Sequence, residues 1–193
     1  MVVPSLSPSM SKPELRAAMR AARDAYVDSL PSGLREAFQA RLASHLHALI
    51  EEAGEVGGYH AIGSEIDPAP ALALASSHSL PSFDAGSSHF RFRRGPATGE
   101  GYRGIPQPGP DAPLAQSPLI LVPLLAIDQR GHRLGQGGGH YDRVLPGLRE
   151  QGATLIGIGW DMQRLEFDLP VEPWDVPLDG FASPAGLEMF ARS

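Results

Sequence analysis

The sequence predicts an α/β fold in which an open, mostly parallel β-sheet carries helices on both faces. Two segments, Leu119 to Ile127 and Thr154 to Trp160, are continuously apolar, as strands buried on both sides of a parallel sheet require. Segments with helical periodicity precede and separate them, which is the alternation expected of an α/β protein. The chain has 193 residues and no internal repeat, so it suits a single domain of the Rossmann-like type.

The composition argues against several classes of protein. The formal net charge of −6 speaks against nucleic-acid binding, which usually requires a basic surface. The absence of cysteine rules out disulfides, thiolate metal ligands and a cysteine nucleophile. No apolar stretch approaches the roughly 18 residues that span a membrane. We therefore expect a cytoplasmic protein with no nucleic-acid or membrane partner, and we expect it to be a monomer.

The N-terminal segment predicts a tail followed by a helix with two distinct faces. Residues 1–10 are expected to be a flexible tail, and residues 11–193 the α/β domain. The helix begins at Ser11, a typical capping residue, with Pro13 in the first turn and Glu14 after it. One face is apolar, and a second face carries basic side chains at helical spacing: Lys12, Arg16, Arg20 and Arg23.

Later segments alternate between helices, short strands and loops. A second amphipathic helix begins at Leu34 and ends near Gly54. Asp67 is expected to cap a further helix that Pro68 opens. The other predicted elements are strands at 56–62 and 89–94, an irregular connection over 95–118, strands at 119–127 and 154–160, and helices at 141–151 and from 184 onward.

A glycine-rich loop, RLGQGGGHYDR at 133–143, lies between the apolar segment 119–127 and a predicted helix. In open α/β sheets, ligands bind where strands end and helix N-termini expose free N–H groups. The glycines can take positive φ and present backbone amides to an anion. Arg133 and Arg143 can neutralise phosphate oxygens, and Asp142 can hold Mg²⁺.

Alternatives to a phosphate-binding loop remain open at this point. The loop is neither a Walker A motif nor a dinucleotide-binding fingerprint. It could be a plain turn, in which Asp142 supplies a charge to the first turn of a helix and Arg143 lies at the surface.

The longer segment VPLLAIDQRGHRLGQGGGHYDR resembles the signature of the 5-formyltetrahydrofolate cyclo-ligase family, also called methenyltetrahydrofolate synthetases. Weaker similarities occur in the order that the family has them: KPELR at 12–16, EID at 65–67, GIPQP at 104–108 and WD at 174–175. Together they extend over nearly the whole chain. On this resemblance the chain is identified as a member of the family, with a cyclo-ligase-like α/β domain.

The resemblance implies an ATP-dependent ring closure, in which 5-formyltetrahydrofolate and ATP give 5,10-methenyltetrahydrofolate, ADP and phosphate. Phosphorylation of the formyl oxygen would create an iminium phosphate, which the neighbouring amine attacks as phosphate departs. The protein would supply positioning and charge neutralisation. The implied cofactors are ATP and Mg²⁺, and the implied substrate is a reduced folate.

The resemblance also assigns residues to the nucleotide and the metal. Lys12 and Arg133 would act in catalysis, and Asp142 and Asp175 would hold Mg²⁺. The residues implied to bind ATP are Lys12, Arg16, Arg133, Leu134, Gly135, Gln136, Gly137, Gly138, Gly139, His140 and Tyr141. Lys12 is the only lysine among 16 basic residues, which favours a function for it. Alternatively, Lys12 and Arg16 belong to a solvated helix face, and Asp175 is a turn residue.

Three residues are implied to contact the folate: Glu65, His60 and Tyr141. Glu65 would accept hydrogen bonds from the N–H groups of the pterin, or it is an acid at a helix entry. Tyr141 would line the pocket or anchor a helix in the core. His60 would touch folate or be a satisfied core histidine. Two further residues are predicted to lie outside the chemistry: Gln107, with a structural role, and Arg35, whose charge reversal is expected to do little.

The chain departs from the family pattern at two positions beside this site. His140 replaces a residue that is usually Tyr or Phe, which reduces aromatic packing against a ligand. Trp174 replaces the polar residue common before Asp175. A second hypothesis is therefore a family member that binds nucleotide or folate without turnover, as a carrier or regulatory protein. A third is another enzyme on a similar fold, such as a sugar-phosphate isomerase, which would consume no ATP.

Overall fold

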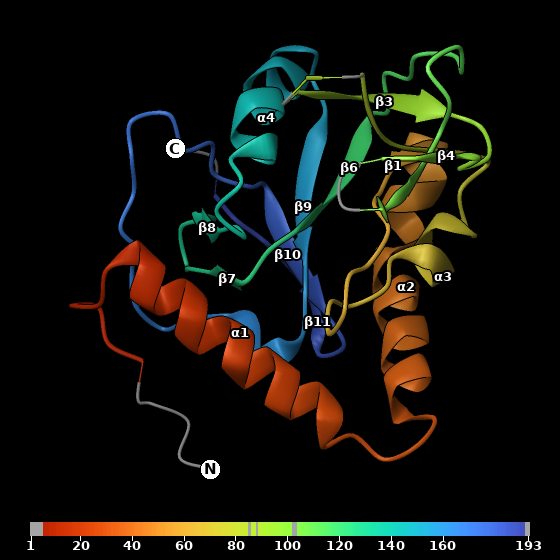
Figure 1. The fold of residues 1–193 in the computed structure, drawn as a ribbon. Helices are drawn as coiled ribbons and strands as arrows, with labels where there is room; N and C mark the ends of the chain where they lie inside the picture. Colours follow the sequence, from red (N-terminus) through yellow and green to blue (C-terminus); the bar gives the residue numbers. More distant parts are fainter. Residues whose placement is uncertain (1–5, 85, 88, 102–103, 192–193) are drawn as a thin grey trace.

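The computed structural model describes residues 6–84, 86–87, 89–101 and 104–191, which form a seven-stranded sheet with helices packed on it (Figure 1). From edge to edge the strands are β11 (Gly186–Met189), β10 (Gly180–Ser183), β9 (Thr154–Ile158), β6 (Leu119–Pro123), β1 (Glu55–Gly57), β2 (Ser77–Phe83) and β3 (Phe90–Arg94). Neighbours pair in parallel from β10 through to β2, and the edge strands β11 and β3 pair antiparallel. The predicted open, mostly parallel sheet is confirmed. Within the described ranges, no helix has the length and apolar character needed to cross a membrane.

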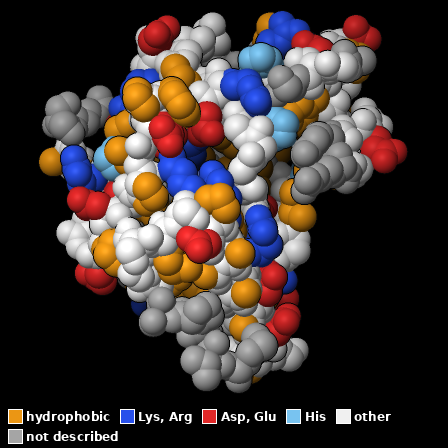
Figure 2. All heavy atoms as spheres, turned by 60° about the vertical axis from the view of Figure 1, so that its left-hand side comes forward, with side chains coloured by type: hydrophobic (Ala, Val, Ile, Leu, Met, Phe, Trp, Pro, Cys, Tyr) orange, Lys and Arg blue, Asp and Glu red, His pale blue; other side chains and the backbone are white. Residues whose placement is uncertain are grey.

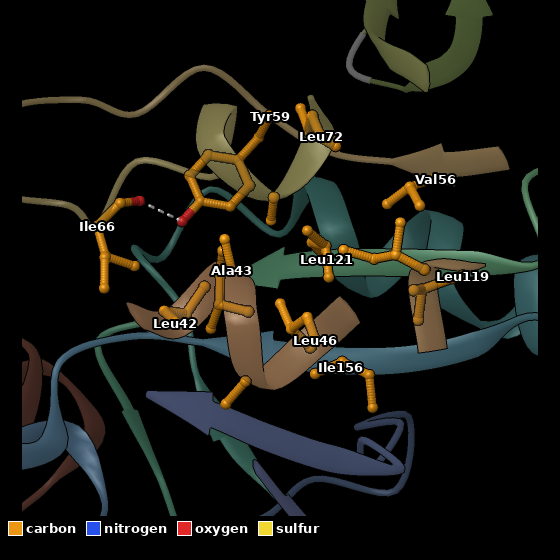
Figure 3. Close-up of a cluster of buried hydrophobic side chains, with 14 of the residues drawn as sticks. Leu42, Ala43, Leu46, Val56, Tyr59, Ile66, Leu72, Leu119, Leu121 and Ile156 are labelled. Atoms are coloured by element: carbon orange, nitrogen blue, oxygen red, sulfur yellow. Dashed lines mark hydrogen bonds between the residues drawn. The ribbon is translucent and has the colours of Figure 1, made fainter. Parts of the chain in front are cut away.

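Helices cover both faces of this sheet. Helices α2 (Leu34–Ala53) and α3 (Ala69–Leu72) pack on one face, and α4 (His140–Glu150) packs on the other. Along β6, Leu119 and Leu121 belong to the cluster under α2, whereas Ile120 and Val122 belong to the cluster under α4. Figure 3 shows the first cluster, with side chains of α2 lying against those of β1, β6 and β9. A strand with apolar side chains on both faces is thus buried between helices, as predicted.

Helix α1 (Lys12–Asp28) packs mainly against a separate small sheet, while its Tyr26 and Val27 pack against the cluster under α2. That small sheet pairs β7 (Ala126–Ile127) with β8 (Arg133–Leu134). Leu15 and Met19 of α1 join Leu134 in a third core cluster. Figure 1 shows α1 running past β7 and β8. Of the expected N-terminal tail, 1–5 lie outside the described residues, and two of the following residues pack partly buried against this cluster: Leu6 and Met10.

The predicted start of α1 and the predicted start and end of α2 are confirmed. The Glu14 carboxylate accepts hydrogen bonds from Ser11 N at 2.8 Å and from Ser11 Oγ at 2.6 Å, which closes the N-terminus of α1. Helix α2 begins at Leu34 and is followed by Gly54, which takes a φ of 68°.

The continuous strand predicted at 119–127 is wrong. Strand β6 ends at Pro123, because proline has no N–H to extend the hydrogen-bond ladder. The chain then turns, and Leu125 N donates to Leu134 O at 2.7 Å, so that β7 pairs with β8. The glycine loop therefore follows β8 rather than the central strand directly.

Several other boundaries differ by a few residues. Strand β1 covers only the start of the segment expected at 56–62, and β9 ends before Trp160, which precedes a short 3₁₀ helix, η2 (Asp161–Gln163). Helix α4 begins one residue earlier than predicted. Pro68, rather than Asp67, directly precedes α3, although Asp67 Oδ1 still accepts a hydrogen bond from Ala69 N at 3.0 Å.

Several strands were not predicted, among them β2, β10 and β11. The helix expected from 184 onward is wrong, because 186–189 turn back as β11 and pair with β10 in a hairpin. Strand β2 at 77–83 is rich in serine and contains a proline, which conceals it from sequence analysis. The connection at 95–118, expected to be irregular, includes a two-stranded sheet of β4 (Gly99–Glu100) and β5 (Pro106–Gln107).

Candidate active site

A cavity of about 810 Å³ lies beside the glycine loop. Its walls come from α1, the segment 59–65 after β1, residues 105–107, the loop 133–142 and the segment 172–175. Every residue that the sequence assigns to the site lines this one cavity. Figure 2 shows a face of the molecule on which Lys and Arg side chains gather close to acidic ones.

The basic face of α1 points toward this cavity. Arg16 Nε donates to Gly135 O at 3.0 Å, and Arg20 Nη2 donates to Gln136 Oε1 at 3.0 Å. Arg23 Nε donates to Ser64 Oγ at 3.0 Å. The helical spacing of the basic residues therefore aligns them along the cavity wall, and they do not form a purely solvated face.

Lys12 connects the first turn of α1 to a distant part of the chain. Its Nζ donates to Asp175 Oδ2 at 2.8 Å and lies 4.0 Å from Glu172 Oε1. Partial burial acts to raise the pKa of Asp175, but hydrogen bonds from Lys12 and from Glu172 N outweigh it. The pKa of Asp175 therefore lies below its ordinary value, and the carboxylate is a permanent counter-charge for Lys12.

Arg133 places a second positive charge, besides that of Lys12, at the wall of the cavity. Its side chain is only 4% exposed, forms an ion pair with Asp142 and donates from Nη1 to Val176 O at 3.2 Å. Burial lowers the pKa of Arg133, while Asp142 and then Asp175 act in the opposite direction. Because an arginine guanidinium keeps its proton in proteins, the charge persists.

The two acidic residues assigned to a metal do not form a complete metal site by themselves. Asp142 contacts Arg133, and Asp175 contacts Lys12. Across the described ranges, no cluster of three or more His, Asp or Glu side chains is arranged to hold a metal ion.

The glycine loop ends at the N-terminus of α4. Gly137 and Gly139 take φ values of 97° and 66°, in the left-handed region that favours glycine. Arg143 Nη1 donates back to Gly138 O at 3.2 Å. Leu134, by contrast, is buried in the cluster under α1, so its side chain anchors the loop.

Glu65 is a buried acid at the opposite wall. The residue is 6% exposed, and its carboxylate accepts hydrogen bonds from Ile62 N and from Gln136 Nε2, each at 3.0 Å. Arg23 Nη1 lies 3.8 Å from Glu65 Oε1 and balances its charge. Burial lowers the pKa of Arg23, and Glu65 opposes that shift. A buried, ion-paired carboxylate is suited to recognising N–H groups of a ligand.

Arg35, whose charge reversal is expected to do little, contacts the segment that carries Glu65. Arg35 Nη2 donates to Gly63 O at 2.8 Å and to Glu65 O at 3.0 Å. It therefore fixes the backbone of the segment that carries Glu65. Gln107 does have the structural role expected of it, since its amide exchanges hydrogen bonds with Phe83 N at 2.9 Å and Phe83 O at 3.1 Å.

His60 and Tyr141 bring buried polar atoms to the cavity. Among the described residues, His60 Nε2 and Tyr141 Oη have no hydrogen-bond partner. The alternative of a satisfied core histidine at position 60 is therefore not supported. Burial raises the pKa of Tyr141, Glu65 raises it further and Arg133 opposes them, so the hydroxyl keeps its proton. The Tyr141 ring also packs at 5.1 Å from the ring of Phe90, so it serves both as a core anchor and as a cavity wall.

The two departures from the family pattern have different surroundings. The His140 ring meets Phe83 edge-to-face with centroids 5.1 Å apart, so aromatic packing at this position persists. Trp174 is 63% exposed at the edge of the cavity, next to Asp175.

Several wall residues were not assigned to the site from the sequence: Arg20, Arg23, Asp24, Ser64, Phe83, Phe90, Ile105, Glu172 and Trp174. The helical spacing of Arg20 and Arg23 with Lys12 was a visible signal for the first two. Phe83 and Phe90 reach the cavity through the pairing of β2 with β3, which no local pattern reveals.

A model of the 5-formyltetrahydrofolate cyclo-ligase family matches residues 8–184. The chain belongs to this family. The cyclo-ligase resemblance inferred from the glycine loop and the shorter motifs is thereby confirmed. The match also covers α1, the Glu65 segment and the 172–175 segment, which together with the glycine loop enclose the cavity.

Relatives that carry the family name align with only part of this chain. The 5-formyltetrahydrofolate cyclo-ligase of Escherichia coli strain K12 is 41% identical over 73 residues, which are 38% of this chain and 40% of that protein. The Haemophilus influenzae protein of the same name is 42% identical over 66 residues, 34% of this chain and 35% of its own. The chain thus spans less than half the length of these relatives in the aligned stretches.

Solved structures extend the similarity to the whole fold. The NMR structure of Aquifex aeolicus 5,10-methenyltetrahydrofolate synthetase matches with a TM-score of 0.75 and 27% identity, over 95% of this chain and 96% of that one. A Mycoplasma pneumoniae 5,10-methenyltetrahydrofolate synthetase matches with a TM-score of 0.68 and 22% identity, over 91% and 99% of the two chains. The single-domain α/β architecture of this cyclo-ligase family member is therefore that of the family.

Proposed function

We propose that this protein catalyses the ATP-dependent cyclisation of 5-formyltetrahydrofolate to 5,10-methenyltetrahydrofolate, with release of ADP and phosphate. The observation that carries the proposal is a single cavity, in a member of this family, with two chemically different ends. The cationic end has Lys12 and Arg133, each paired with a carboxylate, beside the glycine loop, and the other end has the buried Glu65, paired with Arg23. Phosphate groups fit the first end and pterin N–H groups fit the second.

The residues at the cationic end would bind the triphosphate of ATP. Lys12, Arg16 and Arg133 would meet phosphate oxygens, and the backbone amides from Gly135 to His140 would supply donors at the start of α4. Since Lys12 and Arg133 already hold carboxylates, phosphate oxygens would replace or share those partners. Both cations would then be catalytic by neutralising charge that develops as the phosphoryl group moves.

Asp142 and Asp175 would hold Mg²⁺ together with phosphate oxygens. Magnesium in nucleotide sites takes one or two protein carboxylates and fills its other positions with phosphates and water. The two carboxylates at the cationic end fit that pattern. The ion would supply charge neutralisation and orientation of the phosphates.

The other end would bind the folate. Glu65 would accept paired N–H groups from the pterin, while the unpartnered His60 Nε2 and Tyr141 Oη would form hydrogen bonds with polar atoms of the substrate. In this arrangement the formyl oxygen would attack the γ-phosphorus and ADP would leave. The neighbouring amine nitrogen would then attack the formyl carbon, and phosphate would depart with the oxygen. Positioning of the two substrates is the main task of the protein.

We also propose that the protein is a cytoplasmic monomer whose partner is a reduced folate, without nucleic-acid or membrane partners. The net charge of −6 and the absence of cysteine support this part of the proposal.

The test is a continuous measurement of the near-ultraviolet absorbance of the methenyl product. Purified protein, 5-formyltetrahydrofolate, Mg²⁺ and ATP are expected to give a steady rise, which stops when ATP is omitted or EDTA is added. A flat trace from protein whose circular dichroism shows a folded α/β domain would overturn the proposal and favour a family member that binds its ligands without turnover.

A further inference from the structure

Gln136 belongs to the glycine loop, and its side chain contacts Glu65 at the other end of the cavity as well as Arg20 of α1. Its amide nitrogen donates to Glu65 Oε1 at 3.0 Å, and its amide oxygen accepts a hydrogen bond from Arg20 Nη2 at 3.0 Å. Gln136 as a residue is exposed, but the carboxylate that it reaches is buried. A carboxamide is the side chain that satisfies a carboxylate on one side and a guanidinium on the other, because it offers a donor and an acceptor.

The contact determines how the Glu65 carboxylate is oriented. Ile62 N donates to Oε2 and Gln136 Nε2 donates to Oε1, so each carboxylate oxygen has one fixed donor. A carboxylate oxygen accepts about two hydrogen bonds, so one acceptor site on each oxygen remains for a ligand. Two donors on two oxygens prevent rotation of the carboxylate about its last bond. The remaining acceptor sites then face a ligand that offers a parallel pair of N–H groups.

The same residue belongs to the loop that the proposed function assigns to phosphates. The residue before it, Gly135, accepts a hydrogen bond from Arg16 through its carbonyl, and the residue after it, Gly137, has a φ of 97°. A backbone with glycines on both sides of Gln136 can change its course at small cost. A ligand that fixes the loop amides therefore also fixes the position from which Gln136 reaches Glu65.

We propose that Gln136 is a positioning residue that couples occupation of the phosphate loop to the orientation of Glu65, so that nucleotide and folate strengthen each other's binding. This inference rests on the proposed function, because it takes phosphates at the loop and a pterin at Glu65. Coupling of this kind is reciprocal: each ligand raises the affinity for the other by the same factor.

The test compares the wild type with Gln136→Met, which keeps an unbranched side chain of similar length and removes both hydrogen bonds. The dissociation constant of 5-formyltetrahydrofolate is measured by calorimetry alone, with Mg²⁺ and a non-hydrolysable ATP analogue, and with inorganic tripolyphosphate. In the wild type we expect either phosphate ligand to strengthen folate binding about fivefold or more, and in Gln136→Met we expect a factor near one. The affinity of both proteins for tripolyphosphate alone is measured as well, so that any direct loss of phosphate binding is separated from the loss of coupling.

Two controls separate coupling from loop damage. Gln116→Met changes an exposed glutamine outside the cavity, and its coupling factor is expected to equal that of the wild type. Gln136→Glu places a second carboxylate against Glu65 and is expected to weaken folate binding even without nucleotide, because like charges repel. A purely structural role for Gln136 would lower the melting temperature and leave the coupling factor unchanged.

The outcomes distinguish this inference from the proposed function. If the wild type forms product and Gln136→Met retains the wild-type coupling factor, Gln136 is not the connection and the inference is overturned alone. The inference is also overturned alone if the wild type turns over but binds the two ligands independently. If the wild type forms no product, the proposed function fails and this inference fails with it.

Discussion

Lys12 and Asp175 are 163 positions apart in the sequence, yet Lys12 Nζ donates a hydrogen bond to Asp175 Oδ2 over 2.8 Å. The contact joins the first turn of α1 to the segment after η2, at the edge of the candidate active site. It leaves the only lysine of the chain with its charge compensated before any ligand arrives. Under the proposed function, an incoming phosphate would therefore share Lys12 with this carboxylate or displace it.

Lys12→Ala is expected to lower kcat/KM for ATP by roughly 100-fold, because it removes a cation that meets the moving phosphoryl group. The fold should persist, since Lys12 lies in the first turn of a helix whose capping contacts are made by Ser11 and Glu14. Steady-state rates and circular dichroism check both statements. Lys12→Arg should recover part of the activity, because it keeps the charge and loses the compact ammonium geometry. Retention of wild-type rates by Lys12→Ala would remove this residue from the site.

Asp175 should make the stability of the protein depend on acidic pH. Its pKa in the folded state lies below the ordinary value of 3.8, so its contribution to stability is complete above that value. The contribution is lost as the pH falls through the lowered pKa. Melting temperatures between about pH 5 and pH 2.5 should fall less steeply in Asp175→Asn than in the wild type. Parallel curves for the two proteins would contradict the lowered pKa.

Asp142→Asn is expected to raise the Mg²⁺ concentration needed for half-maximal rate by about tenfold, because a neutral amide is a weaker ligand for a hard cation. It should also lower the free energy of unfolding by about 1 kcal/mol, because the buried Arg133 loses a charged partner. Magnesium titrations of the rate and urea unfolding measure the two effects.

The matched control is Asp168→Asn, which breaks an exposed ion pair with Arg130 away from the cavity. This variant should change neither the Mg²⁺ requirement nor the free energy of unfolding. An unchanged Mg²⁺ requirement in Asp142→Asn would show that the metal takes its protein ligands elsewhere.

Two glycines of the loop, Gly135 and Gly137, should differ in how well they tolerate substitution by alanine. Gly137 has a φ of 97°, so Gly137→Ala should cost about 1–2 kcal/mol of stability. Gly135 has no left-handed φ, and nothing lies within 4 Å of a Cβ added there, so Gly135→Ala should unfold at the wild-type denaturant concentration. Equal stability of the two variants would mean that the loop relaxes around the added methyl group.

The two tryptophans allow ligand binding to be followed by fluorescence. Trp160 is fully buried, and its indole N–H donates to Ser64 O at 2.8 Å, whereas Trp174 is 63% exposed beside Asp175. Acrylamide should therefore quench mainly Trp174, and Mg²⁺-ATP should protect it. In Trp174→Phe the remaining fluorescence should be nearly insensitive to both. Quenching that ATP leaves unchanged in an active wild type would place the nucleotide away from Trp174.

Local signals in the sequence were sufficient for the family, the parallel sheet and most of the cavity wall. The motif from Arg133 to Asp142 is contiguous, and the basic face of α1 follows from helical spacing alone. The structure contains the motif and the basic face as predicted, because each depends only on residues that are close in the sequence. The same holds for the capping of α1 by Ser11 and Glu14.

Features that depend on distant partners could not be predicted. The central strand ends at Pro123, and the chain beyond it pairs as β7 with β8, a contact that no local pattern reveals. The terminal hairpin of β10 and β11 replaced an expected helix for the same reason. At the site, the hydrogen bonds of Arg35 could not be predicted, because its acceptors, Gly63 O and Glu65 O, lie in another segment. The bond between Gln136 and Glu65 likewise joins two motifs that the sequence shows only separately.

The contact between Lys12 of α1 and Asp175 has a consequence for biosynthesis. The helix is made before the partner of Lys12, which follows 163 residues later, a delay on the order of 10–30 s at ordinary translation speeds. A nascent chain that ends before 172 would already contain the glycine loop, yet would lack the carboxylates that compensate Lys12. The cavity beside α1 is therefore completed only after the segment 172–175 has been made.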